Sequence, residues 1–314
     1  MNQRIKQQKE GVERRGQRQW VGLVGLMLGS VFLACITAPV IFNAIQALRE
    51  AIPAISDALD YPFERVASRL ALIYVVIGFV PSLKWAGIRS AVDFGFAPHP
   101  TWWRELMRGW RMGVYSILAL IVIAWATGAF VWDPASGRRL LSRLIAYLIG
   151  GLLIGVIEEG LFRGGLFGGA RKVFHWIPAM IVISLFFSFV HFIRPQAPDV
   201  IETARWYSGF SILPHMLYRS ENMWNYMPFA LNLFLMGVVL TLLFQRQNHV
   251  YYISGMHAGW VIALQMGRLL FSNDPNRLYF VYGISANVGR SWAATLMLVI
   301  MAILAARGIF DKTL

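Results

Sequence analysis

Residues 150–163 read Gly-Gly-Leu-Leu-Ile-Gly-Val-Ile-Glu-Glu-Gly-Leu-Phe-Arg, a long apolar run that ends in three charged side chains. The run belongs to an apolar segment, residues 143–162, whose length matches the roughly 20 residues that cross a bilayer core. An uncompensated charge near the bilayer centre costs at least ~2.5 kcal/mol, so ionisable groups in such segments usually face the interior of a helix bundle and mark function. The stretch therefore predicts a membrane helix that carries a functional site.

The spacing of the three charges predicts different roles for the two glutamates. On a helix, Glu159 and Arg163 are four residues apart, share a face and can form an ion pair. Glu158 points about 100° away and lacks that counter-charge. A sheltered carboxylate without a cation is suited to general-base chemistry. The alternative is an ion pair at the membrane edge, with Glu158 reaching out to water.

Composition extends the membrane interpretation to the whole chain. Of 314 residues, 57% are hydrophobic and 14% are charged, whereas a soluble domain has roughly 25% charged residues. The sequence predicts an all-α, polytopic transmembrane helical bundle with about eight membrane helices. The apolar segments lie near residues 21–42, 66–83, 112–132, 143–162, 176–192, 226–244, 251–271 and 292–309.

Charge and cysteine content exclude other classes of protein. The formal net charge is +13, but the 29 Lys and Arg lie between apolar runs, where positive residues set membrane topology. We therefore expect the lipid bilayer, and no nucleic acid, as a partner. The single cysteine, Cys35, excludes an intrachain disulfide and a CxxC site.

The N-terminus resembles a signal peptide, because six Lys and Arg precede an apolar stretch at residues 21–42. That stretch is longer than the 7–15 residues of a signal core, which favours an uncleaved first membrane helix. Lipoprotein-type cleavage before Cys35 is the alternative, and Phe32 fits it poorly. The loop charges place both termini in the cytoplasm, although Arg138, Arg139 and Arg143 then fall outside. A bacterial inner (plasma) membrane fits this pattern.

Four regions follow along the chain. Residues 1–20 form a basic cytoplasmic segment, 21–140 the first three membrane helices, 141–271 a core of helices four to seven, and 272–314 a loop and the last helix. Two connections are long. Residues 87–110, with Trp102, Trp103 and Arg104, indicate an interfacial amphipathic segment, and residues 194–225 form a lid or an ordered surface loop.

Two histidines lie in apolar segments other than that of the glutamates. His191 ends the sequence Phe187-Ser-Phe-Val-His191, and His257 lies between Gly255 and Gly259. A lone histidine in an apolar helix is more often a satisfied core residue than a catalyst. A carboxylate pair and two histidines on three separate membrane helices together favour a functional site.

These three elements resemble the motifs of the CAAX-protease and bacteriocin-processing (CPBP) family of intramembrane glutamate proteases. Residues 158–163 resemble its EExxxR motif, residues 187–191 are similar to its FxxxH motif, and His257 resembles the histidine of its HxxxN/D motif. The motifs occur in the family's order and cover roughly residues 150–265. The ordered set is much more specific than EExxxR alone.

The resemblance implies an intramembrane endopeptidase that hydrolyses a peptide bond in a membrane-associated or lipidated peptide or protein. Glu158 would deprotonate a water molecule that His191 helps to hold and polarise. Glu159 and Arg163 would form a supporting ion pair, and His257 would stabilise the oxyanion. Phe187, which opens the second motif, is placed among the substrate-binding residues. No cofactor is expected.

One position departs from the family pattern. The Asn or Asp expected four residues after His257 is Val261, which cannot donate a hydrogen bond. Losing one oxyanion donor costs ~10²–10³ in rate. Gln265, one turn further along, or Asn232 in the sixth segment are candidate substitutes near the substrate. The departure also keeps open a catalytically inactive, immunity or scaffold protein of this family.

Two further alternatives remain. Glu158, His191 and His257 match the ligand types of a His₂Glu zinc site, although no HExxH motif is present. Intramembrane Glu, His and Arg also build the proton relays of transporters. No inverted repeat or pair of broken helices of the transporter kind is evident in the sequence.

Overall fold

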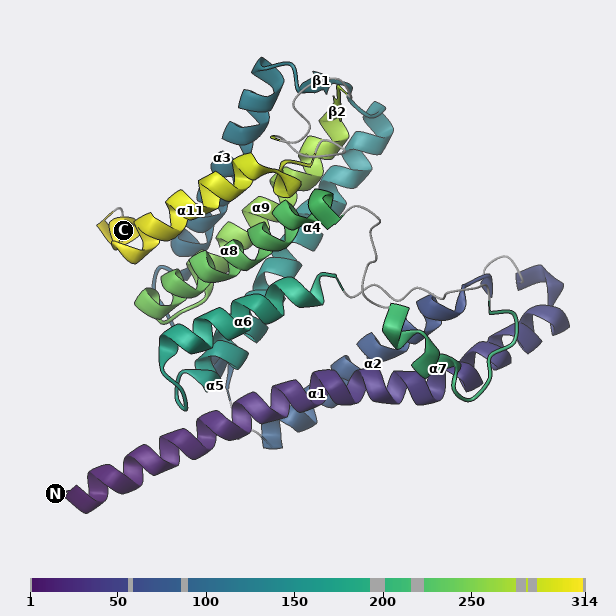
Figure 1. The fold of residues 1–314 in the computed structure, drawn as a ribbon, viewed down its shortest axis with the longest axis horizontal. Coiled ribbons are helices and arrows are strands. Elements are labelled where there is room, and N and C mark those ends of the chain that lie inside the picture. Colours follow the sequence, from purple (N-terminus) through teal and green to yellow (C-terminus); the bar gives the residue numbers. More distant parts are fainter. Residues whose placement is uncertain are drawn as a thin grey trace. The chain divides into compact units, whose positions relative to one another are not determined.

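The computed structural model describes residues 2–55, 59–85, 90–192, 201–215, 223–274, 281 and 287–312. The chain forms two compact units, each of which is described by itself. The first unit contains Met1–Arg89 and Phe189–Glu221, and the second contains Ser90–Ser188 and Asn222–Leu314. Figure 1 shows the almost entirely helical ribbon.

Each of the eight predicted apolar segments corresponds to a helix, so the predicted helical membrane bundle is confirmed. Among the described residues, four helical stretches are long and apolar enough to cross a membrane: Glu10–Ala51, Trp102–Ala126, Leu140–Ala170 and Tyr226–Gln247. The eight helices are α1 (Asn2–Ala51), α2 (Phe63–Trp85), α3 (Trp102–Ala126), α4 (Gly137–Glu159), α6 (Trp176–Val190), α8 (Met223–Gln247), α9 (Tyr251–Leu270) and α11 (Trp292–Ala306).

The remaining elements are short. They comprise the 3₁₀ turns η1 (Pro53–Ile55), η3 (Ala91–Phe94), η5 (Leu213–His215) and η6 (Val288–Arg290), the π-helix η4 (Gly160–Phe167), the helices α5 (Gly168–Ala170), α7 (Ser208–Ser211) and α12 (Ile309–Lys312), and the strands β1 (Phe130–Trp132) and β2 (Phe271–Asn273). The two strands pair antiparallel, and the sequence analysis did not predict them.

The first unit is built on the pairing of α1 with α2. Phe42 and Phe63 pack edge to face in its core, with ring centroids 5.4 Å apart. The Asn43 side chain binds both the N–H and the C=O of Ala204, which ties residues 201–215 to α1. This part of the long predicted connection is therefore ordered against a helix, whereas residues 193–200 and 216–222 lie outside the described part of the chain.

In the second unit, α9 lies between α3 and α4, and glycines set both contacts. A Cβ on Gly109 or Gly255 would collide with a backbone carbonyl oxygen of the facing helix, so α3 and α9 approach closely. Gly151 and Gly155 of α4 also pack closely against α9. A Cβ on Gly151 would collide with the Ile262 side chain, and one on Gly155 would collide with the Ser254 carbonyl oxygen. These contacts hold α9 against the end of α4 (Figure 1).

One sequence prediction needs correction here. Trp102, Trp103 and Arg104 form the first turn of α3 and are not part of an interfacial connection. Pro100 disfavours a helical conformation in the residue before it, and good helix formers follow from Arg104 onward. Residues 86–89 of that connection lie outside the described residues. The compact units group α3 with α4 and α9, and the predicted boundaries at 140 and 271 stay predictions.

Candidate active site

The candidate site begins where α4 changes into the π-helix η4. α4 ends at Glu159, and η4 continues from Gly160 to Phe167 and contains Arg163. Short π-helical turns occur frequently at functional sites. Glycine permits this segment to pack tightly, because a Cβ on Gly164 would collide with the carbonyl group of Phe94.

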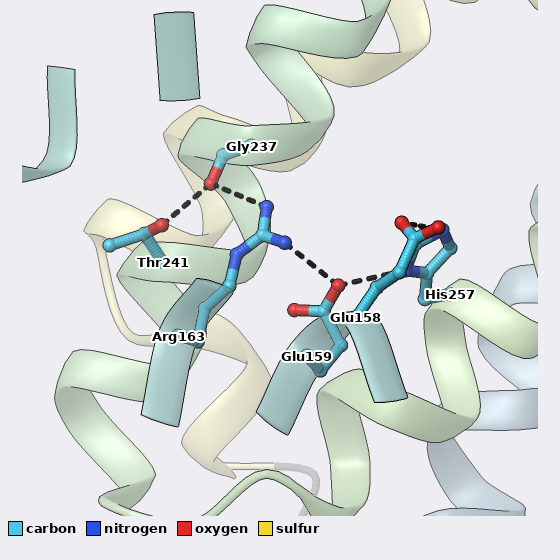
Figure 2. A network of polar contacts seen from close by, with 6 residues as sticks. All are labelled: Glu158, Glu159, Arg163, Gly237, Thr241 and His257. Atoms are coloured by element: carbon cyan, nitrogen blue, oxygen red, sulfur yellow. Dashed lines mark hydrogen bonds and ion pairs between the residues drawn. The ribbon is translucent and has the colours of Figure 1, made fainter. Parts of the chain in front are cut away.

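A buried ion pair anchors the site. Arg163 Nη1 donates to Glu159 Oε1 at 2.8 Å, and the two side chains are 1% and 0% exposed. Arg163 Nη2 also donates to the carbonyl oxygen of Gly237 at 3.4 Å. The guanidinium group lies 4.6 Å from the ring centroid of Phe187. The ion pair expected from the i,i+4 spacing is therefore present (Figure 2). Gly237 of α8 and Phe187 of α6 contact its guanidinium group.

His257 joins the two glutamates. Its Nδ1 lies 2.7 Å from Glu159 Oε1, so Nδ1 carries a proton that it donates to this carboxylate. Its Nε2 faces Glu158 Oε2 at 4.0 Å, as Figure 2 shows. This separation is too long for a direct hydrogen bond and suits a bridging water molecule or substrate group. The buried carboxylate thus fixes the ring and presents Nε2 toward Glu158.

Glu158 and Glu159 have different surroundings although they are neighbours. The Glu158 side chain is 29% exposed, whereas that of Glu159 is fully buried. Within the described residues, His257 is the only group with which Glu158 has an ion-pair contact, and Glu158 Oε2 is buried without a hydrogen-bond partner. Glu158 is therefore the carboxylate that a substrate or a water molecule can reach.

Comparison with known proteins finds one family match. Residues 140–263 match the family model described as "Type II CAAX prenyl endopeptidase Rce1-like". This match supports the resemblance to the CPBP family that the three motifs carry. The matched range runs from the start of α4 to α9 and includes the whole Glu158, Glu159, Arg163 and His257 cluster. The family is generally one of peptidases. No curated protein and no solved structure matches the chain.

The remaining motif residues occupy different places within the matched residues 140–263. Phe187 is fully buried against the cluster, with its ring centroid 5.0 Å from that of Phe162 and 6.1 Å from that of His257. His191 lies in the turn after α6 and not within the helix, since the bond from Phe192 N–H to the Phe189 carbonyl closes a turn there. It is half-buried and belongs to the first unit, so its position relative to Glu158 is not described.

The two candidate substitutes for the missing Asn or Asp, Asn232 and Gln265, have different surroundings. Asn232 donates to the carbonyl oxygens of Gly289 and Ser291 at 3.1 and 2.9 Å and accepts from Thr295 Oγ1 at 2.6 Å. Its amide is therefore used to fix the start of α11. Val261 and Gln265 are half-buried on α9, one and two turns beyond His257.

A metal site receives no direct support from the residues the structure describes, where no three His, Cys, Asp or Glu side chains gather as a metal-binding group. The zinc alternative depends on His191, whose place beside Glu158 and His257 is not described. It stays a prediction that chelation can decide.

The contact between α8 and Arg163 was not predicted from the sequence. The Gly237 carbonyl oxygen accepts from both Arg163 and Thr241 Oγ1, as Figure 2 shows. A Cβ on Gly237 would lie 2.8 Å from that of Ser184, so the absent side chain lets α6 and α8 approach. The available signal was a glycine in the middle of an apolar helix, which indicates close packing without naming its partner.

Proposed function

We propose that the protein is an intramembrane endopeptidase that hydrolyses a peptide bond by activating water beside Glu158. The observation that carries the proposal is the 4.0 Å gap between Glu158 Oε2 and His257 Nε2, backed by a buried ion pair. A gap of this size between a base and a hydrogen-bond donor can be bridged by one water molecule.

The first chemical step is attack by water. Glu158 accepts a proton from the water molecule as its oxygen bonds to the carbonyl carbon, and the carbonyl π electrons move to oxygen. His257, protonated on both nitrogens, donates Nε2–H to the oxyanion that forms. From the resemblance in motif, His191 holds and polarises the attacking water.

The second step breaks the peptide bond. Protonated Glu158 transfers its proton to the leaving nitrogen, the C–N bond cleaves, and the oxyanion electrons restore the C=O bond. The products are a carboxylic acid and an amine, and the acid then loses its proton. Glu158 is regenerated as a carboxylate, and no covalent acyl-enzyme forms.

Glu159 and Arg163 act as positioning residues. The Glu159 carboxylate fixes the His257 ring through Nδ1 and stabilises its charged form, as the buried carboxylate does in other histidine-dependent hydrolases. Arg163 donates to Glu159 Oε1 and fixes the orientation of this carboxylate. The same oxygen lies 2.7 Å from His257 Nδ1, so both residues act through His257.

The proposed substrate is a lipidated or membrane-associated peptide. The matching family is described as one of CAAX prenyl endopeptidases, and a lipid chain would concentrate a peptide in the bilayer beside α4. We place the protein in a bacterial inner membrane with both termini in the cytoplasm, an arrangement supported by the distribution of Lys and Arg. Val261 and Gln265, which are half-buried, are the candidates for contact with a substrate, whereas Phe187 supports the cluster from a fully buried position.

The test is cleavage of fluorogenic peptides, prenylated and unprenylated, by purified protein in lipid nanodiscs. We expect Glu158→Gln and His191→Ala to lower turnover by about 10²–10⁴-fold, the typical contribution of general acid–base catalysis. Glu64→Gln, at the start of α2 in the first unit, is the matched control and should cleave normally. Cleavage by Glu158→Gln at the wild-type rate would contradict the proposal.

Val261 favours one second candidate, a catalytically inactive immunity or scaffold protein with the same fold. That protein would cleave none of the peptides yet would still bind a membrane partner. A proton-coupled transporter would instead move a solute across liposomes without any cleavage. The wild-type cleavage assay therefore separates the peptidase from both alternatives, and solute movement across liposomes separates those two from each other.

A further inference from the structure

One buried hydroxyl in the second unit departs from the usual behaviour of serine in helices. Serine and threonine hydroxyls commonly bond to a carbonyl oxygen three or four residues earlier. Thr241 and Ser116 do so here, with oxygen–oxygen distances of 2.8 and 2.9 Å. Ser254 on α9 is 1% exposed, and its Oγ has no hydrogen-bond partner. Among the described residues, Ser184 is the other buried serine with this property.

Ser254 is placed beside the catalytic cluster by the geometry of α9. It precedes His257 by three residues, and residues at this spacing share a helix face. Side chains on a helix lean toward its N-terminus, so the His257 ring lies over the turn that contains Ser254. Figure 2 shows that ring directed to Glu158 and Glu159.

The packing of α4 places Ser254 at the level of the glutamates. Gly155 of α4 lies directly against the backbone of Ser254, where a Cβ on Gly155 would meet the Ser254 carbonyl oxygen. Glu158 follows Gly155 by three residues on the same helix face. Glu158 Oε2 is itself buried without a hydrogen-bond partner. Helix geometry therefore puts Ser254, Glu158 and His257 at one level of the α4–α9 contact.

Buried polar groups in folded proteins nearly always have partners, so the unpartnered hydroxyl on the His257 face of α9 is free to donate to a bound substrate. The family pattern expects a second donor four residues after His257, and Val261 supplies none. The Asn232 amide is occupied by α11. Gln265 lies two turns beyond His257, on the side opposite to the lean of its ring.

We propose that Ser254 Oγ–H is the second oxyanion donor, in place of the absent Asn or Asp. This inference rests on the proposed peptidase function. The substrate carbonyl oxygen lies between His257 Nε2–H and Ser254 Oγ–H, and its carbon faces the water molecule on Glu158. Ser254 donates a hydrogen bond and forms no bond to the substrate carbon. Its hydroxyl rotates freely enough to follow the oxygen as the carbonyl becomes tetrahedral.

The experiment compares Ser254→Ala with Ser184→Ala, since both remove a buried, unpartnered hydroxyl. Each variant is assayed in nanodiscs with the prenylated peptide for kcat and KM, with a peptide phosphonate as a mimic of the tetrahedral intermediate, and for thermal unfolding. We expect Ser254→Ala to lower kcat by about 10²–10³-fold with little change in KM, and to weaken phosphonate binding in parallel. Its melting temperature should stay equal or rise, because an unsatisfied polar group is removed. Ser184→Ala should cleave normally.

The outcomes distinguish a failure of the Ser254 proposal from a failure of the peptidase proposal. If Glu158→Gln is inactive but Ser254→Ala cleaves at the wild-type rate, Ser254 is not an oxyanion donor and the peptidase proposal stands. If Glu158→Gln also cleaves normally, the peptidase proposal itself fails. A loss of kcat in Ser254→Ala that accompanies an equal loss in Ser184→Ala or a lower melting temperature would show a packing role and overturn the inference.

Discussion

Glu158 and Glu159 are adjacent, yet replacing each with glutamine should have different effects. Glu159→Gln should destabilise the fold, whereas Glu158→Gln should abolish turnover and leave the fold almost as stable as the wild type. Glutamine keeps the size of the side chain and removes its charge. Glu159 is fully buried and accepts from Arg163 and His257 at 2.8 and 2.7 Å. Glu159→Gln leaves the buried guanidinium of Arg163 without a carboxylate, and breaking a buried ion pair in this way costs about 3–5 kcal/mol. That corresponds to about 10²–10⁴-fold in the ratio of folded to unfolded protein.

Glu158→Gln should change the free energy of unfolding much less. Its side chain is 29% exposed, and its nearest charged contact, His257 Nε2, is 4.0 Å away. We expect a change in the free energy of unfolding below about 1 kcal/mol. Turnover should nevertheless fall to background, because the amide of glutamine cannot accept the proton of the attacking water.

The assay is unfolding of each variant in mixed micelles with increasing denaturing detergent, followed by tryptophan fluorescence, alongside peptide cleavage. The double variant Glu159→Gln/Arg163→Gln should be more stable than the sum of the single losses predicts, since no unpaired charge is then buried. Equal destabilisation by Glu158→Gln and Glu159→Gln, or wild-type stability of Glu159→Gln, would refute this reasoning.

Three further predictions concern packing, pH and metals. Gly255→Val inserts a side chain against a carbonyl of α3 and should destabilise the fold by about 1–3 kcal/mol or more, whereas Gly150→Val, which meets open space, should unfold like the wild type. Burial and the neighbouring His99 lower the pKa of His249, against an opposing effect of Glu105. The unfolded chain therefore binds a proton there at higher pH than the folded protein, so stability should fall on acidification below about pH 6.5. His249→Asn should flatten the dependence of the melting temperature on pH, and an unchanged slope would contradict this. Exhaustive chelation should leave cleavage intact, whereas a loss that zinc restores would support the zinc alternative.

Local patterns made part of the site predictable from sequence. The Glu159–Arg163 ion pair depends only on the i,i+4 geometry of one helical segment, and it is present even though this segment is a π-helix. The apolar runs likewise located all eight membrane helices. The start of α3 at Trp102 was missed because an aromatic and basic cluster is typical both of a membrane interface and of the first turn of a helix.

Contacts between distant segments could not be predicted in the same way. The bond between His257 Nδ1 and Glu159 depends on the packing of α4 against α9, which glycines such as Gly155 set. The use of the Asn232 amide at the start of α11 is decided by residues 57–63 positions away in sequence. The unpartnered hydroxyl of Ser254 is a property of its surroundings and has no counterpart in the sequence.

The most direct measurement of the central claim is a single turnover in ¹⁸O-labelled water with prenylated peptide and excess enzyme. If Glu158 activates water for direct attack, the new carboxylate of the product carries one ¹⁸O atom, Glu158 acquires none, and Glu158→Gln yields no product. Label on Glu158, or labelled product from Glu158→Gln at the wild-type rate, would contradict the account.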